Sequence, residues 1–112
     1  MYITITFIEL KHLFKFFALS GYALKILGQL KKEKGFKDFK KTGIGKLHFT
    51  LTVWETEEDL KRFARSGAHL EAMKQSASLA AVVGTYTYQA DVIPGWAEAK
   101  QLVKEKGHHV KF

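Results

Sequence analysis

A strand pattern that runs directly into a capped helix is the feature that most constrains this chain. Residues 47–54 alternate between two kinds of side chain, as in a strand whose faces meet different environments. Thr56 then stands at a helix N-cap, because its hydroxyl can accept from the amide of Asp59. Asp59 and the two glutamates before it place negative charge on the first turn, where the helix dipole favours it. This helix runs into S-G-A-H, residues 66–69, where we expect any chemistry to lie.

The remaining elements follow from periodicity and turn signals. We expect further strands at 2–8, 36–42 and 82–92, a helix from Lys11 that Gly35 stops, and helices at about 67–81, capped by Ser66, and at 96–106. The order strand, helix, strand, strand, helix, strand predicts a ferredoxin-like, split βαβ α+β fold with an antiparallel sheet. We expect a single domain over residues 1–112, with a last helix at about 96–106 and a short C-terminal tail.

One face of this sheet is expected to remain uncovered by the helices. Its occupants would be Thr4, Thr6, His48, Thr50, Thr52 and Trp54. The first helix has only a narrow polar stripe, at Lys11, Lys15, Ala18, Tyr22, Lys25 and Gln29. Because one subunit would leave both surfaces open, the sequence predicts a homodimeric barrel with a small ligand.

Composition excludes several classes of function. The chain has no cysteine, which excludes disulfides, thiolate catalysis and cysteine-bound metal clusters. The net charge of +7 is concentrated in a lysine-rich segment, residues 31–46, which fits either an anionic surface or a solvated helix end and hairpin. That segment has no arginine, so nucleic acid is an unlikely partner. Lys15 and Lys25 interrupt the apolar stretch 13–30, so we expect no membrane partner. The stretch does not have the pattern of a signal peptide either, so we expect a cytoplasmic protein.

A motif at the strand–helix junction resembles a known superfamily. Phe63, Ser66 and His69 form F-x-x-S-x-x-H after V-W-E on the strand, and residues 46–92 resemble the antibiotic-biosynthesis-monooxygenase superfamily of dimeric α+β barrels. They are similar to a bacterial branch of unknown function related to spheroidene-monooxygenase-like proteins, with the pattern W-E-x-x-E-x-L-x-x-F-x-x-S-G-A-H-x-x-A-M. The resemblance implies small homodimers that oxidise polycyclic quinol-type substrates or that bind and degrade haem. In the haem degraders a histidine near the position of His69 ligates iron, with an asparagine on the first strand and a tryptophan on the helix.

The candidate site combines this resemblance with the strand pattern. We expect His69 as catalytic residue or haem ligand, and as ligand-binding residues His48, Trp54, Phe63, Arg65, Ser66, Met73 and Tyr86. His69 has an alternative role in satisfying a backbone carbonyl, and Trp54 an alternative role in the core or a dimer contact. Arg65 can equally be a solvated helix end, and Tyr86 simply a good strand residue. His108 and His109 are expected to be disordered or at the surface.

Two functions remain open. The first is a small-molecule- or haem-binding, monooxygenase-like oxidoreductase, which the histidine at the matching position favours. The second is a non-catalytic binding or structural dimer that keeps the fold. The absence of any asparagine favours the second.

Overall fold

The computed structural model describes the backbone of residues 1–112 and all side chains except those of Ala68 and His69. Five strands form one sheet in the order β2-β3-β1-β4-β5, and every neighbouring pair is antiparallel. The strands are β1 (Tyr2–Leu10), β2 (Phe36–Ile44), β3 (Leu47–Trp54), β4 (Ala80–Gln89) and β5 (His108–Lys111). The helices are α1 (Lys15–Leu30), α2 (Glu57–Ala64), α3 (Gly67–Lys74), α4 (Ser76–Leu79) and α5 (Trp96–Lys106). The ferredoxin-like α+β fold expected from the sequence is confirmed.

Several boundaries differ from the expected ones. The first helix begins at Lys15 rather than Lys11, and the helix expected over 67–81 is divided at Gln75 into α3 and α4. The expected C-terminal tail contains β5, which extends the sheet beyond β4. His108 and His109 are exposed, which confirms the surface alternative, but His109 is ordered, because its Nε2 lies 2.9 Å from the carbonyl oxygen of Val103 and its ring meets Phe7 edge-on.

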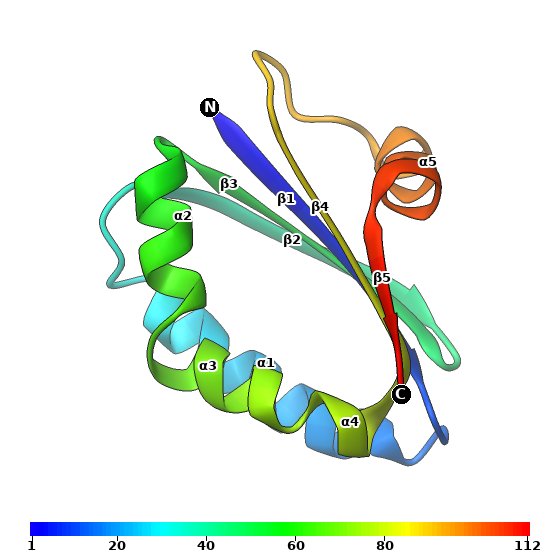
Figure 1. Cartoon of the computed structure of the whole chain (residues 1–112). Helices are drawn as coiled ribbons and strands as arrows, with labels where there is room; N and C mark the ends of the chain where they lie inside the picture. Colours follow the sequence, from blue (N-terminus) through cyan, green and yellow to red (C-terminus); the bar gives the residue numbers. More distant parts are fainter.

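Helices cover both faces of the sheet, which corrects the expectation that one face is open. Figure 1 shows α1 to α4 on one side of the strands and α5 on the other. Trp54 packs against Leu30 and Phe63, so the side of β3 that also carries Thr52 faces the α1 and α2 side. Strand alternation separates two faces but does not say which one a helix covers. The threonines therefore lie beneath α1 to α3, and α5 covers the apolar face.

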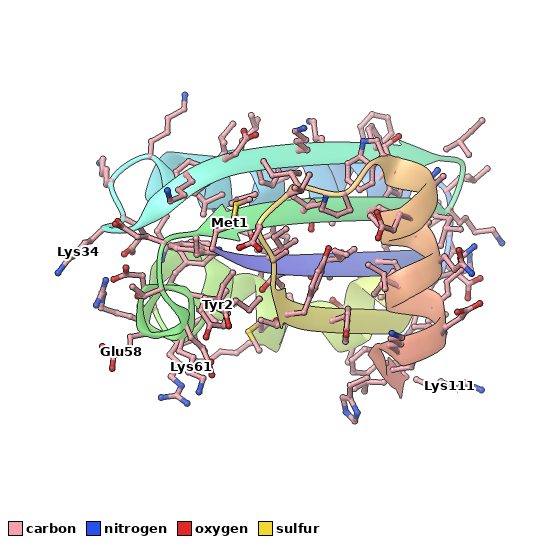
Figure 2. The ribbon with its side chains drawn as sticks, turned by 90° about the horizontal axis from the view of Figure 1, so that it is seen from above. Met1, Tyr2, Lys34, Glu58, Lys61 and Lys111 are labelled. Carbon is pink, nitrogen blue, oxygen red and sulfur yellow. The ribbon has the colours of Figure 1, made fainter. Side chains whose placement is uncertain are left out.

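The apolar face forms the main core. Ile3, Ile5 and Leu51 are fully buried and pack with Ala99 and Val103 of α5. In Figure 2, which looks at the sheet from this side, α5 lies across one end of the strands. Small side chains on α5 allow the helix to approach the sheet closely, and the core residues of this face are buried within one subunit, whereas a hollow of about 170 Å³ remains beside Phe49, Lys100 and Lys104.

The predicted cap of α2 is present in full. Thr56 Oγ1 accepts a hydrogen bond from the backbone N–H of Asp59 at 3.2 Å and donates one to Asp59 Oδ2 at 2.8 Å. Arg62 forms an ion pair with the same carboxylate. The Thr56 hydroxyl, followed by the Arg62 guanidinium, lowers the pKa of Asp59. Gly35 (φ 83°) passes against this carboxylate, so the cap also fixes the loop that follows α1.

Within the described residues, no helix is long and apolar enough to cross a membrane.

Candidate functional site

A regular array of threonines covers the sheet beneath α1 to α3. Thr4 of β1 is paired with Thr52 of β3 and Thr87 of β4, and Thr6 is paired with Thr50 and Thr85 in the same way. We call these residues the threonine face: Thr4, Thr6, Thr50, Thr52, Thr85 and Thr87. Strands packed beneath helices are ordinarily apolar, because a hydroxyl without a partner is costly to bury. These six threonines are half-buried or exposed, and among the described residues none of their hydroxyls is a buried atom without a partner, so the face is accessible rather than a dry core.

Most of these hydroxyls are available to a ligand. The four on β1 and β3 are half-buried, whereas Thr85 and Thr87 on β4 are exposed. Thr4 and Thr87 share a hydrogen bond of 2.9 Å between their Oγ1 atoms. Among the described residues, no hydrogen bond is found for the other four hydroxyls. The helices thus cover this face but leave hydroxyls on it accessible.

One end of the threonine face is closed by aromatic residues. Trp54 is fully buried, its ring centroid lies 5.1 Å from that of Phe63 and 5.8 Å from that of Phe36, and Leu30 completes the cluster. The indole Nε1 is buried and has no hydrogen-bond partner among the described residues. A buried N–H without an acceptor is rare and costly in a folded protein. Trp54 is thus a core residue, as one of the two sequence readings held, and it carries an unused donor.

The other end of the face is open. His48 stacks on Phe16 of α1, with ring centroids 5.4 Å apart, and its Nε2 lies 3.0 Å from the carbonyl oxygen of Gly45. A hollow of about 370 Å³ adjoins this pair, and it is lined by Leu13, Phe16, Phe17, Gly43, Ile44, Gly45 and His48. His48 and Trp54 share a face as predicted, but they lie at opposite ends of β3, about 20 Å apart at the usual rise per residue. They mark two ends of one surface rather than two walls of one pocket.

The S-G-A-H junction is held by a residue that the sequence analysis did not select. Gln29 Nε2 donates to the carbonyl oxygen of Ser66 at 3.0 Å, and a Cβ on Gly67 (φ 58°) would lie 2.8 Å from the Gln29 side chain. The Ser66 hydroxyl does not cap α3 as expected; it donates to the carbonyl oxygen of Arg62 at 3.0 Å. Gln29 was assigned to a polar stripe because helical spacing alone does not show which loop lies beside the helix. The side chain of His69, in α3, lies outside the described residues.

Other predicted site residues lie elsewhere. Arg65 is exposed at the end of α2, and Met73 of α3 is 54% exposed. Tyr86 stacks on Tyr88 and packs with the core beneath α5, so it lies on the opposite face of the sheet from Trp54. Burial, with contributions from Glu98 and Tyr86, raises the pKa of Tyr88. Of the predicted set, the structure brings together Trp54 and Phe63 and leaves Tyr86 apart.

The described residues do not form a haem site. His48 is engaged by Gly45 and Phe16, and its Nδ1 is close against Gly43. His109 is held by Val103 and Phe7 on the other side of the sheet. No group of three or more metal-ligating side chains is present in the described part of the chain. Any role for haem therefore depends on His69.

Solved structures from several organisms share the fold of this chain. A conserved protein from Methanosarcina mazei Go1 superposes with a TM-score of 0.73 at 15% identity, covering 80% of this chain and 92% of that one. A putative antibiotic biosynthesis monooxygenase from Nitrosomonas europaea gives 0.71 at 18% identity, covering 82% and 100%. SnoaB, a cofactor-independent oxygenase from Streptomyces nogalater, gives 0.67 at 10% identity, covering 84% and 97%. No protein-family model and no curated protein sequence matches the chain. The chain thus has the α+β fold of antibiotic-biosynthesis-monooxygenase-like structures, and the resemblance expected from its sequence is confirmed at the level of the fold.

Proposed function

We propose that this chain is a monooxygenase-like oxidoreductase that binds a small, largely apolar molecule with oxygen acceptors on the threonine face. The observation that carries the proposal is the set of accessible hydroxyls beneath α1 to α3, because four of the six have no hydrogen-bond partner among the described residues and can bond to a ligand. The shared fold with a cofactor-independent oxygenase supports the same class of function.

The chemistry of the face suits a flat, oxygen-bearing ring system. Free hydroxyls at Thr6 and Thr52 can donate to or accept from a carbonyl or phenol, whereas Phe16 at the open end supplies an apolar contact. At the closed end, the Trp54 N–H would gain an acceptor if a ligand oxygen reached it after a small movement of Phe63. Such a bond would remove the desolvation cost of the orphaned donor.

The test uses 1,4-naphthohydroquinone as a probe. We expect the purified protein to bind it and to raise oxygen uptake above the rate of its spontaneous oxidation. Thr6→Val and Thr52→Val keep the shape of the side chain and remove the hydroxyl, so each should weaken probe binding about fivefold to tenfold, as expected for one lost hydrogen bond. The matched control is Thr42→Val in β2, since Thr42 is paired with Phe49, which belongs to the core beneath α5. Equal binding by all four proteins would contradict the proposal.

A non-catalytic binding protein is the second candidate, and the absence of asparagine favours it. Probe binding that depends on Thr6 and Thr52, without any increase in oxygen uptake, would establish this alternative. The threonine face would then be a binding surface, and the proposed oxidoreductase activity would be wrong.

Haem binding through His69 is tested by titration. If His69 ligates iron, the parent should show a shifted Soret band that His69→Ala abolishes and that His48→Ala and His108→Ala retain. If the parent binds no haem and His69→Ala lowers the free energy of unfolding by about 1–3 kcal/mol, then His69 holds a buried hydrogen bond instead.

The homodimer stays a prediction. One of its two reasons is removed, because the threonine face lies beneath helices of its own chain. The second reason remains, since Leu24 on α1 is 71% exposed. Sedimentation equilibrium that gives only the mass of one chain at micromolar concentration would contradict it.

A further inference from the structure

An exposed apolar surface occupies the end of the molecule where α1 begins. Phe17 is 78% exposed and Ile44, in the β2–β3 hairpin, is 87% exposed. We call the exposed set around them the tip patch, and it comprises Leu13, Phe14, Phe16, Phe17 and Ile44. Four of the five line one hollow, so the helix start and the hairpin form a continuous surface although they are distant in sequence. Large side chains gathered in this way mark an interaction site rather than ordinary surface.

Two lysines flank the tip patch. No acidic residue occurs between Glu9 and Glu33, a stretch that includes the whole of α1. Lys15 lies within this stretch with its Nζ 5.9 Å from the ring centroid of Phe14, and Lys46 is exposed in the hairpin turn beside Ile44. Neither lysine has an ion-pair partner in the described part of the chain. Exposed Glu9 lies opposite Leu47 at the same end of the sheet, but it forms no ion pair with either lysine in the described part of the chain.

We propose that the tip patch docks the protein on the surface of a membrane that contains anionic phospholipid. Phenylalanine, leucine and isoleucine enter the boundary between headgroups and acyl chains, and lysines around them meet anionic headgroups. A second copy of the chain fits less well, because it would bring two sets of unpaired lysines together. The absence of a membrane-spanning helix does not bear on a contact of this kind. The proposal replaces the sequence-based expectation of no membrane partner, and it does not depend on what binds at the threonine face.

Vesicle co-sedimentation tests the docking. The full chain is mixed with vesicles of phosphatidylcholine alone and with vesicles of phosphatidylcholine and phosphatidylglycerol in equal amounts. We expect binding to the mixed vesicles that is about tenfold or more tighter than to the neutral ones and that weakens as salt is raised. Binding to neither kind of vesicle, or equal binding to both, would overturn the proposal.

Matched variants show whether the patch is responsible. Phe17→Ser and Ile44→Ser should each lower vesicle binding several-fold, whereas Val92→Ser, a replacement at another exposed apolar residue (76%), should not. Lys46→Gln should weaken binding to the mixed vesicles, and Lys106→Gln on α5 is its control. Circular dichroism checks that each variant is folded, which is expected at exposed positions. If Phe17→Ser instead abolishes self-association in sedimentation velocity and leaves vesicle binding unchanged, the patch is an interface between copies and the proposal is wrong.

Discussion

The two faces of this sheet are built from the same strands and serve different purposes. Ile3 and Ile5 of β1 point toward α5 and are fully buried, whereas Thr4 and Thr6 between them point toward α1 and are half-buried. The core of the α5 face is buried within the subunit itself. The threonine face keeps hydroxyls and one indole N–H without partners among the described residues. The main core thus lies on the α5 face, whereas the threonine face combines one buried aromatic cluster with accessible hydroxyls.

Neighbouring replacements in β1 give the largest expected contrast between the faces. Ile5→Ala should lower the free energy of unfolding by about 2–5 kcal/mol, because it leaves a cavity in the core beneath α5. Thr6→Val adds no volume to a closed core and should change the same quantity by less than about 0.5 kcal/mol. Urea unfolding followed by circular dichroism measures both values. Similar losses in the two variants would show that the threonine face is as tightly packed as the core.

A replacement at Trp54 sharpens the comparison at the closed end of the threonine face. Trp54→Phe keeps an aromatic ring against Phe63 and removes the orphaned N–H, so relief of that donor partly offsets the lost contacts. We expect the free energy of unfolding to fall by about 1–2 kcal/mol, because the smaller ring leaves a cavity beside Leu30 and Phe36. The affinity for 1,4-naphthohydroquinone should also fall. Expressed as free energy, the loss of binding should exceed the loss of stability. A large destabilisation with unchanged probe binding would assign Trp54 to the core alone.

Sequence reasoning recovered the fold because its signals are local. Alternation in residues 47–54 and the Thr56 cap each depend on neighbours within a few positions, and both appear in the structure as expected. The prediction of which face the helices leave uncovered was wrong, because alternation in a strand is the same for both faces of the sheet. The face that each helix covers depends instead on how the chain crosses over the sheet, and on the small residues that let α5 approach.

The candidate site was less predictable than the fold because its contacts join distant segments. Gln29 reaches Ser66 across 37 positions, and nothing in the helical spacing of α1 indicates that contact. Tyr86 was placed with Trp54 although β4 presents it to the opposite face. The threonine array, in contrast, was visible as alternating threonines in β1 and β3, and register alone was needed to join them to Thr85 and Thr87. Register is set by the whole sheet and is not encoded in any single strand.

The smallest expected effect concerns the cap that positions α2, and hence Phe63, at the closed end of the threonine face. Asp59 accepts from Thr56 and Arg62, which lowers its pKa in the folded state from the ordinary value of 3.8. Because the folded state holds this proton less tightly than the unfolded chain, the stabilisation is fully present above that value and is lost as the pH falls through the lowered folded pKa. Asp59→Asn should therefore be less stable than the parent at neutral pH, and the difference should shrink below about pH 4. Thermal unfolding across this pH range measures the difference, with Glu58→Gln as the control, since Glu58 has no ion pair in the described part of the chain. If the difference in stability between the parent and Asp59→Asn stays constant down to the most acidic pH, the amide disturbs the cap by its shape. The charge of the Asp59 carboxylate would then contribute nothing to the cap that positions Phe63 against Trp54.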